Sequence, residues 1–415
     1  VGCCCAQSCE GSIENPFDYF MWVAVEGQVQ DKIFHLLPPL SITNALPITI
    51  ECVIKYTDTQ SKCDHQIIPA GATVPVHLAN FSKTLENGII LSPFGLSENI
   101  LPINIPKTPE LSTFTFTDDE GRSFLLRQEN LCDAKTSERK ITVFSDFWIM
   151  NRTGLPLLYK TPKSTRIEAG QHESCFTLLQ GDPRDWYPEK ASPPDPFLYS
   201  NSSKNVPMCI QVAESQWSEA VDLSTEQMFR CLSITGQEIY DNVPQYELAV
   251  TVKPSSELFW RTREVIIVPR FLLVNETNSV IHYHQCGLDS RFILSPAQQL
   301  PYHWSNASLD QSISLTKAPA DNKTFRWSSP IKIDKLGIQT VKLRAENNLY
   351  EYAIISVHVL LDKSSNVTLV VIKENTEYPD LVVDNQLEIP IQISQSDCKI
   401  IDSIPRKTRV PFAWD

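Results

Sequence analysis

Four segments of this chain share one pattern, in which an apolar run ends at an asparagine, turns, and continues into a second apolar run. The asparagines are Asn44, Asn151, Asn275 and Asn385, and they lie 107, 124 and 110 residues apart. Such spacing is typical of tandem small domains, because about 100 residues suffice to enclose one hydrophobic core. The sequence therefore predicts an internally repeated protein whose function belongs to the array.

Two further signals recur in register with the last two asparagines. Trp217 and Trp327 each begin a Trp-Ser pair, and each lies 58 residues before one of these asparagines. A Pro-aromatic-x-Trp element ends at Trp304 and at Trp414, in each case 29 residues after the asparagine. The first two units lack this element, although the Val-Pro-Val-His-Leu stretch at 74–78 is a candidate remnant.

The distribution of residue types indicates strands throughout. Val, Ile, Thr, Phe and Tyr concentrate in short runs bounded by Pro, Asn, Asp, Ser or Gly. Residues 112–128 alternate on both sides of 118–121, which predicts a hairpin. The best helix candidates, 224–233 and 305–315, are short, and 29 prolines oppose long helices. We expect an all-β fold, a curved tandem array of antiparallel β-sandwich repeats.

Little linker separates the units, so neighbouring repeats are expected to contact each other in a fixed arrangement. The insertion at 181–205 in the second repeat is rich in proline and is expected to be a loop for partner contact. The chain does not begin with Met, and we expect it to be a piece of a longer protein. The predicted units are an N-terminal extension (1–31), three repeats (32–143, 144–268 and 269–378) and the start of a fourth (379–415).

Charge limits the classes of partner. The formal net charge of −13 on 415 residues argues against nucleic acid and against electrostatic docking on anionic lipid, since both need a basic surface. No apolar run approaches the ~20 residues that cross a bilayer. We therefore expect protein partners, indirect membrane contact and a monomeric chain.

The twelve cysteines occur at different places in the successive repeats and form no pair of C-x-x-C motifs. This distribution predicts free thiols in a reducing compartment and no zinc site. The Cys3–Cys5 run is interpreted as a loop of small residues rather than an acylation site. Seven N-x-[ST] sequons point instead to a secreted chain: Asn80, Asn151, Asn201, Asn275, Asn306, Asn322 and Asn366.

Signals for catalysis are weak. His282 and His284 would share one face of a strand, but no third ligand lies in register, so no metal site is expected. The acidic residues at 118–120 are interpreted as a solvated turn. No nucleophile motif or phosphate-binding loop occurs in the sequence. We therefore expect no enzyme activity and no cofactor.

Three segments carry a family resemblance: VPRFLLVNETNS (268–279), NRTGLPLLY (151–159) and VPFAWD (410–415). They resemble the adaptor-binding region of the vacuolar protein sorting-associated protein 13 family, from about residue 32 onward. The resemblance implies a chain of β-sandwich repeats that binds Pro-x-Pro motifs of adaptors. It also implies that the whole protein is a lipid-conducting bridge at the cytoplasmic face of endosomes, Golgi or contact sites.

The resemblance implies these adaptor-binding candidates: Asn44, Asn151, Asn275, Asn385, Trp304 and Trp414. The residues alone favour structural roles. An asparagine that ends a strand usually bonds the following turn, at about 1 kcal/mol. Tryptophans 217, 304, 327 and 414 are expected to fill cores rather than stack on proline. An adhesion or receptor ectodomain and an enzyme with a site in one repeat stay open as alternatives.

Overall fold

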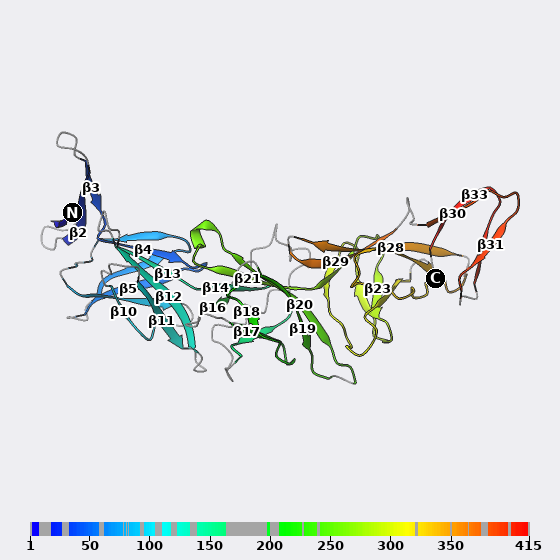
Figure 1. Cartoon of the computed structure of the whole chain (residues 1–415), viewed down its shortest axis with the longest axis horizontal. Helices are drawn as coiled ribbons and strands as arrows, with labels where there is room; N and C mark the ends of the chain where they lie inside the picture. Colours follow the sequence, from blue (N-terminus) through cyan, green and yellow to red (C-terminus); the bar gives the residue numbers. More distant parts are fainter. Residues whose placement is uncertain are drawn as a thin grey trace.

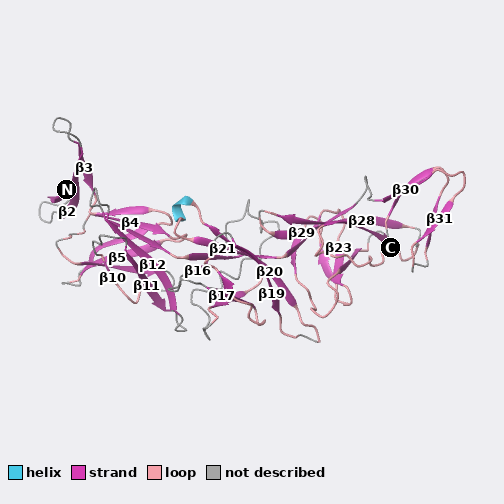
Figure 2. Ribbon diagram, viewed as in Figure 1, coloured by secondary structure: helices cyan, strands magenta, loops and turns pink. Residues whose placement is uncertain are grey.

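The chain folds almost entirely into strands, which confirms the all-β prediction (Figure 2). Among the described residues the only helical element is one 3-10 turn, η3 (Glu257–Phe259), and no helix there is long and apolar enough to cross a membrane. The computed structural model describes residues 2–7, 18–26, 33–57, 62–77, 79, 81, 83–91, 95–103, 110–117, 123–132, 139–162, 197–199, 207–225, 228–238, 241–319, 323–348, 351–363, 365–374, 381–396 and 400–413.

Three N-terminal strands form a small antiparallel sheet before the first sandwich. They are β1 (Gly2–Gln7), β2 (Asp18–Glu26) and β3 (Ile33–Leu37). Cys3 and Cys5 of β1 pair with Trp22 and Phe20 of β2. The prediction of a small-residue loop here is wrong, because the apolar strand β2 offers a pairing partner along the whole cysteine run.

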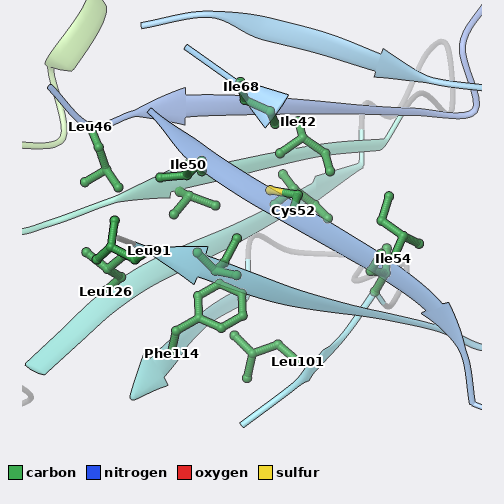
Figure 3. Packing of buried hydrophobic residues seen from close by; sticks show 14 of the residues in the cluster. Ile42, Leu46, Ile50, Cys52, Ile54, Ile68, Leu91, Leu101, Phe114 and Leu126 are labelled. Atoms are coloured by element: carbon green, nitrogen blue, oxygen red, sulfur yellow. The ribbon is translucent and has the colours of Figure 1, made fainter. Parts of the chain in front are cut away.

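The first sandwich packs two five-stranded sheets on each other. One has the order β10-β8-β5-β6 with β9 beside β8, and the other has the order β11-β12-β13-β4-β7. Inward side chains such as Ile42, Cys52 and Phe114 form one buried cluster (Figure 3). Strands β11 and β12 pair as the predicted hairpin, whose turn lies outside the described residues. The strands are β4 (Leu40–Ala45), β5 (Ile50–Tyr56), β6 (Lys62–Ile68), β7 (Thr73–Val76), β8 (Leu85–Leu91), β9 (Gly95–Leu96), β10 (Leu101–Pro102), β11 (Glu110–Thr117), β12 (Ser123–Cys132) and β13 (Arg139–Phe144).

The second sandwich has a five-stranded sheet, β16-β14-β21-β20-β19, over a smaller sheet, β15-β17-β18. Strand β16 comes from the insertion at 181–205 and pairs with β14, so this part is an edge strand and the prediction of a contact loop is wrong for it. The rest of the insertion lies outside the described residues. The strands are β14 (Phe147–Asn151), β15 (Leu157–Lys160), β16 (Phe197–Tyr199), β17 (Pro207–Val212), β18 (Val221–Asp222), β19 (Met228–Thr235), β20 (Gln245–Pro254) and β21 (Arg263–Pro269).

The third sandwich repeats this plan, with sheets β25-β22-β29-β28-β27 and β24-β23-β26. Two two-stranded sheets follow, β30-β33 and β31-β32, and the units lie in a row along the molecule (Figure 1). The strands are β22 (Phe271–Asn275), β23 (Ile281–Gln285), β24 (Phe292–Leu294), β25 (Gln299–Tyr302), β26 (Ile313–Lys317), β27 (Gly337–Arg344), β28 (Tyr352–Asp362), β29 (Val367–Glu374), β30 (Leu381–Asn385), β31 (Ile391–Ser394), β32 (Ile401–Ile404) and β33 (Thr408–Phe412).

One strand pair in each sandwich departs from the antiparallel prediction. The first strand of the repeat runs parallel to the last: β4 with β13, β14 with β21, and β22 with β29. The last strand continues into the next repeat after only two residues at 145–146 or one at Arg270. Both strands therefore point along the array, and a parallel pair results.

An edge strand covers the first strand of every repeat. β7, β16, β25 and β33 pair antiparallel with β4, β14, β22 and β30. Pro75, Pro301 and Pro411 occupy the same register position in three of them. Proline has no backbone N–H to donate, so an edge suits it. The stretch at 74–78 is thus confirmed as the counterpart of the Pro-aromatic-x-Trp element.

Both helix candidates are wrong. Residues 224–233 enter β19, and 305–315 lead through turns into β26. In β19, Leu232 and Ile234 are buried whereas Phe229 and Cys231 are exposed. This two-residue alternation fits pairing with β20, which decides the conformation over weak local preference.

The first and second sandwiches meet at the η3 turn. The ring of Phe259 lies edge-on to Trp148 at 4.7 Å, and Trp148 belongs to the buried cluster of the first sandwich. Gly71 has φ +70°, and a Cβ there would lie 3.4 Å from the Phe259 ring. Side chains from both units therefore build this contact.

The second and third sandwiches share backbone and side-chain contacts. Gln245 donates its N–H to the carbonyl of Trp304 at 2.9 Å and accepts the Trp304 N–H at 3.1 Å. Arg270, the single linking residue, pairs with Glu247 at 2.9 Å. An apolar cluster crosses the junction and contains Ala249, Val268, Leu272, Val274, Val367 and Val371.

His303 lies at this junction, with its ring 5.4 Å from that of Tyr246. Both ring nitrogens are shielded from solvent and have no hydrogen-bond partner, although the residue as a whole is half-buried. Burial lowers the pKa of His303 from 6.5 to about 4. As the pH falls, the unfolded chain therefore binds a proton at His303 before the folded chain does. The contribution of the neutral His303 to the free energy of unfolding is fully present above pH 6.5 and is lost as the pH drops toward 4.

We expect this proton linkage to lower the free energy of unfolding by roughly 3 kcal/mol between pH 7 and pH 4. His303→Phe should remove that part of the pH dependence, as measured by urea unfolding across the range. His65→Phe, at an exposed imidazole, serves as the control. Equal pH profiles for His303→Phe and the unmodified chain would contradict the expectation.

A buried ion cluster joins the third sandwich to the fourth unit. The carboxylate of Asp402 accepts hydrogen bonds from Lys342 at 2.7 Å and from both terminal nitrogens of Arg344 at 2.9 Å. The side chains of Lys342 and Arg344 are only 1% and 3% exposed. Burial by itself would raise the pKa of Asp402, but these hydrogen bonds and charges outweigh it and lower the pKa.

Candidate functional site

Asn275 ties together three parts of the third repeat. Its Oδ1 accepts the backbone N–H of Thr277 at 2.9 Å and the Thr277 hydroxyl at 2.7 Å. Its Nδ2 donates to the carbonyls of Ser279 and Leu294, both at 2.9 Å. The side chain is completely buried. One amide thus joins the end of β22, the turn after it and the end of β24.

The same bonds recur at Asn44 and Asn385. In each, Oδ1 accepts the N–H two residues on, at 3.1 and 3.0 Å, and Nδ2 donates to the carbonyl four residues on, at 2.7 and 3.0 Å. Nδ2 also lies within hydrogen-bond distance of two successive carbonyls of a later strand, at 68–69 or 404–405. The asparagine pattern in the sequence is therefore the signature of one repeated turn.

A left-handed residue completes the turn. Gly71, Ala297 and Lys407 have φ of 70°, 59° and 55°. The N–H groups of Gly71 and Ala297 donate to the backbone carbonyls of Asn44 and Asn275, both at 2.9 Å. Glycine adopts this geometry without strain, whereas alanine and lysine require the surrounding bonds to hold them.

Among the described residues, Asn151 has fewer hydrogen-bond partners than the other three asparagines. Its Nδ2 donates to the carbonyl of Leu155 at 2.7 Å, and Oδ1 accepts the N–H and hydroxyl of Thr153 at 3.0 and 2.7 Å. The residue is half-buried. The segment at 163–196, which would contain the later strand, lies outside the described residues.

Trp304 fills the core of the third sandwich, as predicted. It is 1% exposed, with its ring 5.9 Å from that of Phe271 and 5.0 Å from that of Tyr302. Trp414 lies outside the described residues. The structure therefore places Trp304 among core side chains, while the asparagines lie at the turns.

Trp217 and Trp327 do not fill cores, so the prediction is wrong for them. Both are half-buried, and neither belongs to a buried hydrophobic cluster of the described chain. The Lys160 ammonium lies 4.3 Å from the Trp217 ring, and the His284 ring lies 4.1 Å from that of Trp327. Lys160 and His284 each stand nine residues after the asparagine of their repeat, on the outer face of the small sheet.

The serine of each Trp-Ser pair binds the neighbouring strand. Ser218 donates its N–H to the carbonyl of Ile210 at 2.8 Å, and its hydroxyl oxygen accepts the Ile210 N–H at 2.9 Å. Ser328 binds β26 in the same way. Ser97 binds Ile89 likewise in the first repeat, at 2.7 and 3.2 Å. The sequence search missed this third example, because leucine replaces the tryptophan before Ser97.

His282 and His284 share the outer face of β23, as predicted. The Nδ1 of His284 hydrogen-bonds the carbonyl of Leu288, and its ring contacts Trp327. Among the described residues, no group of three or more His, Cys, Asp or Glu side chains is placed to hold a metal ion. The His284 ring is therefore held by ring packing and a hydrogen bond.

The sequence that forms this repeated turn and these sandwiches matches one protein family. The family model of the vacuolar-sorting associated protein 13 adaptor binding domain matches residues 29–415. The chain belongs to this family. The repeated asparagine turn thus lies within an adaptor binding domain.

Among curated relatives of this adaptor binding domain is the intermembrane lipid transfer protein VPS13 of Chaetomium thermophilum. It is 24% identical over 92% of this chain and 12% of its own length. The human intermembrane lipid transfer protein VPS13D is 22% identical over 92% of this chain and 9% of its own length. The intermembrane lipid transfer protein tipC of Dictyostelium discoideum is 27% identical over 51% of this chain and 7% of its own length. The chain thus spans a small part of each relative.

Proposed function

We propose that this chain is an interaction scaffold that recruits a large lipid-transfer protein to organelle membranes and contact sites by binding Pro-x-Pro-type motifs of adaptors. The observation that carries this proposal is the adaptor-binding family match over 29–415, together with the sandwich array. Curated relatives named as intermembrane lipid transfer proteins support the larger role. In this proposal the chain is a monomer without enzyme activity or cofactor.

Two observations support a location on the cytoplasmic face rather than a secreted ectodomain. Free thiols are found at Cys52, Cys132, Cys209, Cys231 and Cys286, and burial raises the pKa of Cys52 to about 12. The amide nitrogens of the described sequon asparagines donate to internal acceptors. A glycan attaches at that nitrogen, so these sites oppose glycosylation of the folded chain. The sequons concerned are Asn151, Asn275, Asn306 and Asn366.

Within this proposal, the candidate site residues act mainly by holding the backbone of their own repeat in place. Asn44, Asn275 and Asn385 are at most 2% exposed, and their amides bond the backbone of their own repeat. Trp304 is equally buried. We propose that they shape the strand ends beside which a peptide lies. Asn151, which is half-buried, and Trp414, which lies outside the described residues, complete the candidate set.

The proposal predicts that the chain binds a subset of an immobilised Pro-x-Pro peptide array. The expected result is saturable binding that calorimetry reproduces in solution. Replacing both prolines of a peptide with alanine should reduce its affinity at least tenfold. Scrambled peptides of the same composition provide the control. Equal binding to proline-containing and alanine-substituted peptides would overturn Pro-x-Pro recognition by this chain.

A further inference from the structure

The small sheet of the third repeat carries a cationic and aromatic surface on its outer side, near β23 in Figure 1. We call it the Trp327 surface; it consists of His284, Arg291, Ile293 and Trp327. Arg291 is exposed and lies 5.5 Å from the Trp327 ring, and the His284 ring lies 4.1 Å from it. Ile293 is 57% exposed. The surface thus combines a cation, a half-buried indole and an open apolar side chain.

Strand β24 forms the edge of this surface. It pairs with β23 on one side, and no described strand pairs with its other side. An edge strand offers unpaired backbone N–H and C=O groups, which an extended peptide can bind as an added strand. Arg291 and Ile293 alternate with Phe292 and so face outward together, about 7 Å apart along the strand.

Arg291 distinguishes the surface electrostatically. Its guanidinium makes no ion pair with a described residue, whereas Lys317 and Lys332 of the same repeat pair with Glu374 and Asp310. Burial, and then the charge of Arg291, lower the pKa of His282 beside it. Arg291 is thus a local cation without an ion pair to a described residue, and it favours an acidic group on a partner at this place although the whole chain carries a net charge of −13.

The second repeat shows which part of this arrangement belongs to the fold. Lys160 lies over Trp217 at the positions that His284 and Trp327 occupy in the third repeat. A basic side chain against the tryptophan is therefore a repeated packing feature. Arg291, from the opposite edge of the sheet, adds a guanidinium cation 5.5 Å from the Trp327 ring.

We propose that the Trp327 surface binds an extended acidic peptide of an adaptor, which adds as a strand to β24. Its carboxylate lies beside Arg291, which contacts the Trp327 ring, and a proline two residues further on packs against Ile293. Side chains two apart share a face of an added strand, so this spacing matches the alternation of β24. Proline suits an outermost strand, since its missing N–H costs no ladder bond there. The inference rests on the proposed function, because the occupant is an adaptor peptide.

Two labelled peptides test the proposal by fluorescence anisotropy with the full chain. The acidic peptide is Gly-Ser-Asp-Val-Pro-Val-Pro-Val-Ser-Gly, and the basic one has Lys in place of Asp. The acidic peptide should bind about tenfold more tightly. Arg291→Glu should weaken its binding at least tenfold and reverse the preference. Trp327→Ala should weaken the binding of the acidic peptide, because the indole ring no longer holds Arg291 in place. Trp327→Phe, which keeps an aromatic ring, should retain most of the affinity and shows whether loss in the alanine variant reflects unfolding.

Lys335→Glu is the matched control, because it reverses an exposed charge in the same repeat. An equal loss in Lys335→Glu would assign the effect to overall charge and overturn the proposal. If the peptides bind but Arg291→Glu and Trp327→Ala leave affinity and preference unchanged, the Trp327 surface is not the site, while the proposed function stands. If neither peptide binds and the Pro-x-Pro array is also empty, both proposals fail.

Discussion

Replacing Asn275 with alanine is expected to lower the free energy of unfolding of the third repeat by about 3 kcal/mol. The change leaves the carbonyl of Leu294 and the N–H of Thr277 without their amide partner, whereas the carbonyl of Ser279 keeps the bond from the Thr277 hydroxyl. Each buried polar group without a partner costs about 1–3 kcal/mol. This exceeds the roughly 1 kcal/mol of an ordinary lost cap. Native-state hydrogen exchange of β22 to β24 measures the effect locally.

Asn151→Ala provides the matched comparison, because its side chain is half-buried and donates one hydrogen bond to the described residues. We expect it to cost about 1 kcal/mol. Equal losses in the two variants, or a loss below 1 kcal/mol at Asn275, would contradict the view that bond number and burial set the cost. Peptide affinity measured on the folded Asn275→Ala variant separates positioning of the strand end from direct contact.

Asp402→Ala is expected to release the fourth unit from the third sandwich. The change leaves the nearly buried Lys342 and Arg344 without their carboxylate. Removing one partner of a buried ion pair costs about 3–5 kcal/mol. The described part of the fourth unit forms two-stranded sheets, which are marginal by themselves. Hydrogen exchange should therefore show lost protection in β31 and β32, while the core of the third sandwich stays protected.

Glu388→Ala is the control for this variant. Its ion pair with Lys407 lies in the same unit, with side chains 81% and 56% exposed, and an exposed pair contributes at most about 1 kcal/mol. The pKa of Asp402 is lowered from 3.8, so its contribution is present above pH 3.8 and is lost as the pH falls below that value. Unchanged protection in Asp402→Ala at neutral pH would contradict a coupling role.

Local sequence signals were sufficient where each residue acts within its own turn. The side-chain amides of Asn44 and Asn275 accept a hydrogen bond from the N–H two residues later and donate one to the carbonyl four residues later. Their turn can therefore be predicted from neighbouring positions in the sequence. Alternating apolar residues likewise predicted the β11–β12 hairpin. The helix candidate at 224–233 failed, because its strand conformation depends on pairing with β20, which lies later in the chain.

The sequence by itself determined that this protein is an array of strand-built repeats with an asparagine turn in each, because period-two alternation and short-range turn bonds need no distant partner. Only the tertiary structure decided the parallel first–last pairing, the burial of Trp304, and the exposure of Trp327 beside Arg291. Trp304 and Trp327 look alike in sequence, yet one points between the sheets and the other lies on an outer face. Strand register and the packing of one sheet on another set that difference, and both join residues far apart in the chain.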